Sequence, residues 1–486
     1  MSSSTSGRAP GRQATGAAAP GNAGTSDLPT LSSERIWGFW SFTSVNIGLA
    51  IATWAFLSGG TLAFFVGAKT AIAASVIGNL VGVALVALTT CIPSAKYGLE
   101  QYTALRTVFG GNGSRALVLV LFPLAAAGWN AILAIMFGRA IVNVSNSTLG
   151  TDFGPNGAMV IAAALFAILL SWLLLVKGPV SIEWVNKFVA PALVLVTVVM
   201  LGAIFTEHSW SELLAAPPLA PFGDPGLDWA IAVELSLGVG FSWWTIMGNL
   251  ARLTTTQRVA FWPNMIGLFL ASVVAGVVGS FAALVLGDAD PTVWMVPLGG
   301  AVLGVLALVF VGFANVTSMV GQTYSGSLAI RRAGGDPARR LPWPVLAGLL
   351  FAPAAVVVFW PGAIYDNYFK FLAWVSLILA PLCAVYFVDF FLLRRRTLDV
   401  RAIYEPEGVS RYSFWGGFNP AAFVAVAAGA FTYYQLLDPI TFESASMFRY
   451  TTASLPAFLV AAVVHYVLTR LVVVPNGRGG YVHQRR

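Results

Sequence analysis

Two adjacent hydroxyl residues lie in a segment that is otherwise strongly apolar. In "GFANVTSMVGQTYSGS", residues 312–327, Ala314, Thr317 and Ser318 have the i, i+3, i+4 spacing that places side chains on one face of a helix. Sodium is a hard cation that binds several oxygens, so these hydroxyls and the free carbonyls of a broken helix opposite could hold it. The alternative is structural, because hydroxyls in apolar helices usually donate to the preceding turn or to a neighbouring helix.

Glycines interrupt two other apolar runs. They are Gly48, Gly59 and Gly60 in the first run, and Gly238 and Gly240 of "GVGFSWWTIMGN", residues 238–249, in the sixth. Irregular backbone at membrane depth is tolerated only where protein covers it or where it lines a cavity, so broken helices predict a binding site and a transport function. Each glycine alone has a simpler explanation, which is close packing of two helices.

A membrane-embedded bundle must position these segments. Hydrophobic residues make up 57% of the chain and charged residues 10%, which excludes an ordinary water-soluble domain. Runs of about 20 apolar residues, enough to cross about 30 Å of hydrocarbon as a helix, recur twelve times. Their approximate centres are Ala52, Val81, Ala127, Leu165, Leu195, Leu237, Val273, Val309, Val356, Leu379, Ala427 and Val463.

The predicted fold class is an all-α polytopic membrane protein with twelve transmembrane helices. The interrupted first and sixth runs are five runs apart, as expected for an inverted repeat of five plus five helices followed by two C-terminal helices. Residues 33–474 form the predicted transporter domain. Residues 1–32, rich in Ser, Gly, Ala and Pro, are predicted to be a disordered cytoplasmic tail, and residues 475–486 a cytoplasmic C-terminal tail.

The distribution of basic residues predicts the topology. Of the 27 Lys and Arg residues, all but Lys69, Arg139, Lys370 and Arg449 fall on one side of the predicted bundle. Lys and Arg accumulate in short cytoplasmic loops, so both termini are predicted to be cytoplasmic. The membrane is predicted to be the inner membrane of a bacterial-type cell. The net charge of +7 then reflects topology and contact with anionic lipids, and no nucleic-acid partner is expected.

The sequence contains no motif that indicates an enzyme. Cys91 and Cys383 lie in or near apolar runs, the three histidines are scattered, and no metal-ligand, Walker or nucleophile-elbow motif occurs. Among the intramembrane acids, Glu234 could couple protons, pair with Arg139 or face an outer vestibule, and the last two roles are favoured. Asp389 precedes an arginine cluster and is expected to pair locally.

Four segments carry a resemblance to a known family. They are "LSGGTLAFFVGAKTAIAASVIGNLVG", "KYGLEQYTALRTVFGGNGS", "FLAWVSLILAPLCAVYFVDFFLLRRRTLDV" and "YSFWGGFNPAAFVA". In order and spacing they resemble the nucleobase:cation symporter family 1, which includes cytosine, purine, uracil, allantoin and hydantoin permeases. The last two are the most specific, with Asp389 before a basic cluster and then Tyr412 and Asn419 opening the next helix. The likeness runs from about Ser33 into the eleventh run.

The resemblance implies a LeuT-type fold, alternating access and a substrate held between helices one, three, six and eight. In "AAAGWNAILA" Trp129 matches the tryptophan that stacks on a planar heterocycle in the family. Ala314, Thr317 and Ser318 match the sodium ligands on helix eight, joined by carbonyls of Gly48 and Ile51 on helix one. Sodium is thus the expected coupling ion, with a proton as the alternative, and no other cofactor is expected.

The remaining substrate contacts are predicted from helices three, six and eight. The candidates are Asn130, Gly240, Phe241, Trp243, Trp244, Asn315 and Gln322. The three amides could equally be packing residues, and one of the two adjacent tryptophans could belong to an interfacial belt. The chain departs from the family at Ala126 and Leu133, where relatives have a glutamine, and at Asn249, where an acid is usual.

The predicted function is import of a nucleobase or related planar N-heterocycle by cation symport. An amino-acid or amine symporter of the same fold is the nearest rival. It would need a charged partner for its substrate at helices one and six, where the sequence shows only half-helix ends. A channel is disfavoured because no ring of charges or filter-like repeat is present.

Overall fold

The computed structural model describes residues 28–176 and 179–481, and within them the backbone is helical apart from turns and three isolated β-bridges. Nine helices in the described part are long and apolar enough to cross a membrane, or ten if one bent pair is counted as a span. Helices also stand at the two remaining predicted places, but α17 (Trp343–Val357) and α21 (Pro420–Leu436) are only 15 and 17 residues long. The all-α fold is confirmed, and the count of twelve spans stays a prediction.

The first repeat contains five long elements. They are α1 (Phe39–Ala50) with α2 (Thr53–Phe65); α3 (Ala68–Val86) with η2 (Ala87–Cys91) and α4 (Ile92–Tyr97); α6 (Gly111–Leu149); α7 (Ala158–Leu175); and α8 (Pro179–Glu207). Shorter helices join or precede them: η1 (Ser32–Glu34), α5 (Gln101–Phe109) and α9 (Trp210–Ala215). Glycines in the left-handed conformation, at φ 68° for Gly98 and 64° for Gly150, end α4 and α6.

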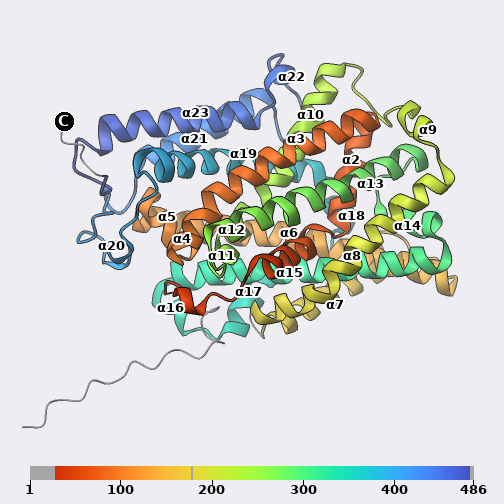
Figure 1. Cartoon of the computed structure of the whole chain (residues 1–486), viewed down its shortest axis with the longest axis horizontal. Helices are drawn as coiled ribbons and strands as arrows, with labels where there is room; N and C mark the ends of the chain where they lie inside the picture. The colour runs from red at the N-terminus through yellow and green to blue at the C-terminus, as the bar shows by residue number, and fades with distance from the viewer. Residues whose placement is uncertain (1–27, 177–178, 482–486) are drawn as a thin grey trace, which may run out of the picture.

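The second repeat and the C-terminal helices follow. They are α10 (Pro225–Ser242) with α11 (Trp244–Ala251); α12 (Gln257–Asn264) with η3 (Met265–Leu270) and α13 (Ala271–Leu286); α14 (Pro291–Gly299) with η4 (Gly300–Gly304) and α15 (Val305–Ala333); α16 (Gly335–Arg340); α17; α18 (Pro361–Tyr365); α19 (Tyr368–Phe387) with η5 (Val388–Leu393); α20 (Val400–Tyr404); α21; α22 (Phe448–Thr451); and α23 (Ser454–Leu468) with η6 (Thr469–Val473). In Figure 1 most long helices run along the long axis of the molecule, and α21 and α23 form a layer at one side.

The break in the first span lies at Ile51 and Ala52, where α1 and α2 meet at 55°. Gly59 and Gly60, which were expected to interrupt this span, lie inside α2. The sixth span is interrupted only at Trp243, and Pro225–Ala251 counts as one span of 27 residues. Gly238 and Gly240 lie inside α10, so the predicted unwinding at these two glycines is wrong.

Gly59 and Gly240 instead take part in two backbone-to-backbone contacts between helices, which we call the glycine seams. In one seam, between α2 and α13, Gly59 packs on Gly276 and Phe56 on Gly279. In the other, between α3 and α10, a Cβ on Gly240 would lie 2.7 Å from the Cα of Gly82. One seam joins spans one and seven, and the other joins spans two and six. In the five-plus-five repeat span one corresponds to span six and span two to span seven, so the two seams occupy equivalent positions. The packing explanation of these glycines is therefore the correct one.

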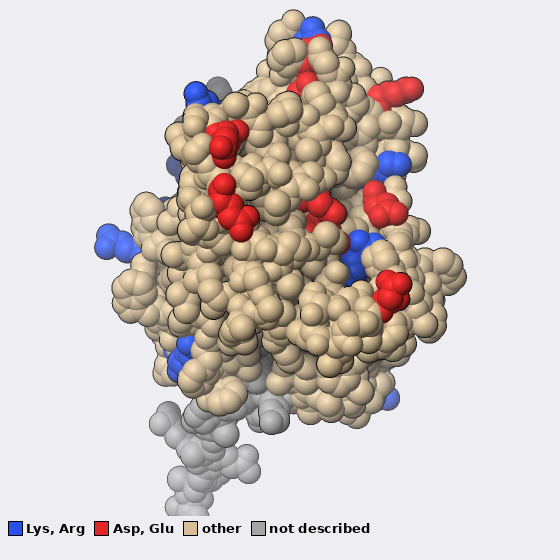
Figure 2. All heavy atoms as spheres, turned by 90° about the vertical axis from the view of Figure 1, so that its right-hand side faces the viewer, with Lys and Arg blue, Asp and Glu red and all other residues tan. Residues whose placement is uncertain are grey.

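The two ends of the bundle differ in charge. Figure 1 places α16 and α20 at one end of the molecule and α9 and α14 at the other. Figure 2 looks onto the second end, where acidic side chains are spread over a surface that is otherwise largely uncharged. Two of the four basic residues that fall outside the predicted cytoplasmic side form ion pairs with acids at this end. Arg139 pairs with Asp290 at 3.0 Å, and Arg449 pairs with Asp224. These pairs explain why basic residues occur at an otherwise acidic end.

Residues of both predicted tails form backbone hydrogen bonds with the rest of the described chain. Residue Thr30 is buried, and its N–H donates to the carbonyl of Gly98 at 2.9 Å. At the other terminus the N–H of Gly479 donates to the carbonyl of Ser413 at 3.2 Å. Thr30 and Gly479, which fall within the predicted tails, thus contact residues of the predicted transporter domain, and the domain boundaries themselves stay a prediction. Residues 1–27 and 482–486 of the predicted tails lie outside the described residues.

Candidate substrate chamber and cation site

A small cavity, which we call the chamber, lies where the first span breaks. Its volume is about 30 Å³, and the broken first span, α6, the end of the sixth span and α15 enclose it. The lining residues are Leu49, Trp54, Trp129, Leu133, Trp243, Ile246, Ser318 and Gln322. None of these side chains carries a charge. This volume has room for about two water molecules, which is less than a heterocycle would need.

Three tryptophans dominate the chamber wall. The ring of Trp54 lies edge-to-face with Trp129, with centroids 6.0 Å apart, and with Trp243 at 5.7 Å. Aromatic pairs prefer this arrangement over a face-to-face sandwich. A flat ring placed between them would meet π faces and edges from three different helices.

The polar atoms at the chamber are few and incompletely paired. Within the described part of the chain, the indole N–H of Trp243 and the side-chain oxygen of Gln322 are buried without a hydrogen-bond partner. An unpaired buried polar group costs about 1–3 kcal/mol. The pair offers one donor and one acceptor, which complements the N–H and C=O groups on the edge of an amide-like ring.

Aromatic residues of α19 close one side of the chamber. Phe371 lies edge-to-face with Trp129 at 5.3 Å and Tyr368 at 6.3 Å. The hydroxyl of Tyr368 is 2.6 Å from that of Ser58 on α2. The start of α19 therefore contacts both the chamber residue Trp129 and the broken first span.

Polar contacts join three helices near the chamber. Asn249 accepts from the N–H of Gln101 at 2.8 Å and donates to the hydroxyl of Ser325 at 2.9 Å, which links α5, α11 and α15. Asn249 therefore joins three helices even though it cannot form the ion pair that an acid could. Nearby, Glu100 caps α5, and burial raises the pKa of its carboxyl while its hydrogen bonds and Arg252 act in the opposite direction.

The predicted cation ligands largely converge beside the chamber. The hydroxyl of Thr317 lies 3.2 Å from the carbonyl oxygen of Gly48 and 2.9 Å from that of Ala314. The hydroxyl of Ser318 lies 3.1 Å from the carbonyl oxygen of Leu49. These oxygens come from α15 and from the end of α1, where the helix break frees carbonyls. Their chemistry fits a hard cation such as sodium.

Ile51, the fifth predicted ligand, is the C-cap of α1 and is buried beside this group. No contact of its carbonyl with Thr317 or Ser318 is found, and Leu49 contributes a carbonyl that the sequence did not indicate. Gly48 is also crowded, because a Cβ at this position would overlap the side chain of Asn186 on α8. The fifth span therefore borders the cation site.

Three of the eight predicted substrate contacts line the chamber, namely Trp129, Trp243 and Gln322. Two of the amides form hydrogen bonds next to it: Asn130 donates to Thr323 at 2.8 Å and Asn315 to Thr53 at 2.7 Å. The structure places the other three away from the lining. Gly240 belongs to a glycine seam, and Phe241 and Trp244 are fully buried, the latter against Phe122 at 6.4 Å.

Both adjacent tryptophans are buried, so neither belongs to an interfacial belt. The most important residue that the sequence analysis missed is Trp54. It lies two residues after the break at Ala52, and an aromatic residue directly after a break in an apolar run was the available signal. Leu133 was noted only as a departure from the family, and it lines the chamber.

The buried acids near the acidic end have structural partners. Glu234 accepts from the N–H groups of Ala453 and Ser454, both at 2.9 Å, and from the Ser454 hydroxyl at 2.5 Å. It therefore caps α23, and neither its pairing with Arg139 nor its place in a wet vestibule is borne out, since it is 2% exposed. Arg139 binds Asp290 instead.

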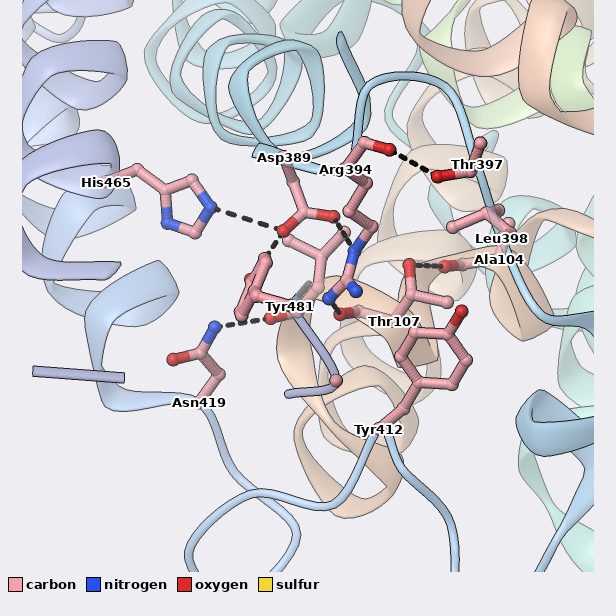
Figure 3. Close-up of polar contacts among 12 residues, drawn as sticks. Ala104, Thr107, Asp389, Arg394, Thr397, Leu398, Tyr412, Asn419, His465 and Tyr481 are labelled. Carbon is pink, nitrogen blue, oxygen red and sulfur yellow. Dashed lines mark hydrogen bonds and ion pairs between the residues drawn. The ribbon is translucent and has the colours of Figure 1, made fainter. Parts of the chain in front are cut away.

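A second buried polar group, the Asp389 cluster, lies near the arginine-rich end (Figure 3). Asp389 accepts from Arg394 Nε at 2.6 Å and from the Tyr481 hydroxyl at 2.6 Å, and Arg394 also donates to the carbonyl of Thr107. The expected local pairing of Asp389 is thus confirmed. The guanidinium of Arg394 lies over the rings of Tyr481 and Tyr412, at 4.1 and 4.9 Å.

Comparison with known proteins assigns the chain to a family. Residues 29–438 match the family described as permease for cytosine/purines, uracil, thiamine, allantoin. The chain belongs to this permease family. Among similar proteins, hydantoin permease of Microbacterium maritypicum is 21% identical over 83% of this chain and 82% of its own. Cytosine permease of Escherichia coli (strain K12) is 24% identical over 81% of this chain and 84% of its own.

Solved structures show the same fold. Mhp1, a nucleobase-cation-symport-1 family transporter, was solved closed with bromovinylhydantoin bound, and it matches with a TM-score of 0.72 at 18% identity over 92% of this chain and 95% of its own. Its inward-facing conformation matches with a TM-score of 0.74 over 92% of this chain and 94% of its own. The resemblance inferred from the sequence is confirmed. The protein is a multi-pass membrane transporter of this permease family.

Proposed function

We propose that this permease imports a neutral planar N-heterocycle of the nucleobase or hydantoin class together with sodium. The observation that carries the proposal is the chamber wall of Trp54, Trp129 and Trp243 around an uncharged interior. Stacking of a base on an aromatic side chain contributes about 1–3 kcal/mol and suits any flat heterocycle. The indole N–H of Trp243 and the side-chain oxygen of Gln322, both without a partner within the described residues, would then form hydrogen bonds with the edge of the ring.

The uncharged lining also argues against the amino-acid alternative. An amino-acid or amine substrate brings an ammonium group, and burying a charge without a partner is costly. No acidic or basic side chain is among the residues that line the chamber. The half-helix ends of the first span are dipoles, which suit polar groups of a neutral ring equally well.

Sodium is the coupling ion that the geometry favours. The oxygen atoms of Gly48, Leu49, Ala314, Thr317 and Ser318 gather at the break of the first span. Ser318 also lines the chamber, so one residue borders both the ion and the substrate. Such a shared residue would make the binding of each depend on the other. Glu234, the acid considered for proton coupling from the sequence, is engaged in capping α23.

The proposed orientation of the protein in the membrane follows from the unequal distribution of basic and acidic residues between its two ends. The arginine-rich end, which carries α16, α20 and the C-terminal residues, is proposed to face the cytoplasm, and the acidic end the outside. Uptake would then proceed from the acidic end, past the start of α19, into the chamber.

Uptake into proteoliposomes tests the proposal. Radiolabelled cytosine, uracil, hypoxanthine, allantoin, a 5-substituted hydantoin and phenylalanine would each be supplied with an inward sodium gradient or with choline. We expect one or more heterocycles to accumulate only with sodium. Accumulation of phenylalanine alone would refute the substrate class, and heterocycle uptake driven equally well by a proton gradient without sodium would refute the coupling ion.

A matched pair of variants addresses the ion site. Thr317→Val removes a hydroxyl of the cation site while keeping the side-chain shape, and we expect the sodium concentration for half-maximal uptake to rise about tenfold or more. Thr432→Val is the control, because its hydroxyl donates only to Ala428 within α21. Unchanged sodium dependence in Thr317→Val would exclude this hydroxyl as a ligand.

A further inference from the structure

A large apolar hollow, which we call the lateral groove, lies between α6 and α19 and shares no lining residue with the chamber. Its volume is about 650 Å³, and the end of α17, α18 and the residues after α21 complete its walls. The small residues Ala125, Ala127 and Gly128 of α6 leave room for it. Pockets of about 300–1,000 Å³ typically hold organic ligands, so this groove has the size of a ligand site.

The groove carries one charge on an otherwise apolar lining. Among the described residues that line it, Lys370 is the only charged one, and the amide of Asn367 donates to the carbonyl of Ala363 at 2.8 Å. Lys370 is half-buried and forms no ion pair with an acidic side chain of the described chain. Asp366, one turn earlier, is exposed. The ammonium group of Lys370 is therefore available to an anion in the groove.

The groove has the depth of one membrane leaflet. Lys370 is in the first turn of α19, whereas the arginine cluster beginning at Arg394 follows η5 at the other end of the same span. Along α19 the rise from Asn367 to Leu379 is about 18 Å, and one leaflet is about 15 Å, half of the hydrocarbon core. Trp374 lines the groove and is exposed, so the groove opens onto the surface of the bundle.

We propose that the lateral groove binds one acyl chain of an anionic phospholipid, whose phosphate group lies at Lys370. Lipid tails are as apolar as the groove, so the tail alone gives little preference for the groove over the bilayer. The ammonium group of Lys370 supplies the preference, because a basic side chain near the bilayer surface attracts anionic headgroups. A zwitterionic phospholipid has the same tail but no net charge on its headgroup, and it therefore binds the groove more weakly.

One residue connects the groove to the chamber. Phe371 lines the groove, and its ring lies edge-to-face with the chamber residue Trp129 at 5.3 Å. The same ring rests on the backbone of α6, because a Cβ on Gly128 would lie 2.6 Å from it. An acyl chain in the groove would therefore contact a side chain that packs against the chamber wall. The lipid site itself does not depend on which substrate or coupling ion the chamber takes.

Native mass spectrometry tests the site independently of transport. The protein is reconstituted with equal amounts of phosphatidylglycerol and phosphatidylcholine, extracted into detergent, and weighed with the lipid that it retains. Two variants change the groove: Ala125→Trp fills it with a large side chain, and Lys370→Gln removes its charge. Their matched controls are Ala427→Trp and Lys69→Gln, which change exposed residues outside the groove.

We expect the wild type and both controls to retain one phospholipid, with phosphatidylglycerol favoured about fivefold, the effect of one basic side chain near the bilayer surface. Ala125→Trp should abolish this retention, and Lys370→Gln should abolish the preference between the two lipids. Equal retention in Ala125→Trp and Ala427→Trp would overturn the groove as the binding site. An equal preference in Lys370→Gln and Lys69→Gln, or no preference in the wild type, would overturn the role of Lys370. If Ala125→Trp does not fold, Ala363→Trp on α18 provides the same comparison.

Discussion

The chamber and the buried pair of Asp389 and Arg394 differ in how completely their polar atoms are hydrogen-bonded. Asp389 receives hydrogen bonds from Arg394 and Tyr481, and Arg394 reaches the carbonyl of Thr107 as well. In the chamber the indole N–H of Trp243 and the amide oxygen of Gln322 have no partner within the described residues.

The difference separates a structural role from a binding role. The hydrogen-bonded pair of Asp389 and Arg394 joins elements that are distant in the chain, here η5, α5 and the C-terminal residues. Unsatisfied groups beside aromatic walls are costly in the folded protein and are useful only when something else pairs with them. The predictions below therefore expect stability effects from the cluster and effects on transport from the chamber.

The largest effect is expected from breaking the buried ion pair. Asp389→Leu leaves the guanidinium of Arg394 buried without its carboxylate, which typically costs about 3–5 kcal/mol. Thermal unfolding in detergent should show a large loss of stability. The double variant Asp389→Leu/Arg394→Met, which removes both charges, should be more stable than the single one. If the double variant is no more stable, the ion pair does not account for the loss.

Tyr481→Phe should have a smaller effect on the same cluster. It removes one hydrogen bond to a charged acceptor, which contributes about 1.5–3 kcal/mol. A lower melting temperature with unchanged substrate affinity is the expected result. Tyr450→Phe is a suitable control, because Tyr450 is 76% exposed. A change in substrate affinity instead would mean that the cluster and the chamber are not separate in function.

Trp129→Ala should weaken substrate binding by about 1–3 kcal/mol, the contribution of one base stacked on an aromatic ring. Uptake kinetics should show a KM raised roughly fivefold to 150-fold, and Trp129→Phe should retain part of the affinity. Trp184→Ala removes an indole that is 64% exposed on α8 and serves as the control. Equal KM values in Trp129→Ala and the wild type would exclude stacking on this residue.

The smallest effect is expected from Gln322→Leu, which removes the free acceptor from the chamber. The loss of one hydrogen bond between neutral groups changes binding by about 0.5–1.5 kcal/mol. The loss should differ among heterocycles, so the ratio of kcat/KM values for two substrates is the measurement. A uniform reduction for all of them would assign Gln322 a packing role.

The sequence predicted the helices and part of the site because their signals are local. Apolar length marks the spans, and the spacing of Thr317 and Ser318 puts their hydroxyls on one helix face, where the structure places them beside α1. The pairing of Asp389 with Arg394 was predicted because the two residues are five positions apart. Tyr481, 92 positions away, could not be connected to it by pattern.

Other features depend on contacts between distant segments. A glycine such as Gly240 suits a helix break and a close helix contact equally well, and only its partner Gly82 on another span decides between them. Trp54 gave no periodic signal in an apolar run. Its role depends on the 55° bend, which brings it between Trp129 and Trp243.

The glycine seams have a consequence for protein engineering. Gly59, Gly82, Gly240 and Gly276 hold four helices together through their backbones, and none of them lines the chamber. Directed evolution of a new substrate range can therefore leave these positions fixed. Libraries at Leu133 and Ile246, which border the chamber with apolar side chains, would alter its shape and hydrogen-bonding pattern without disturbing the helix contacts.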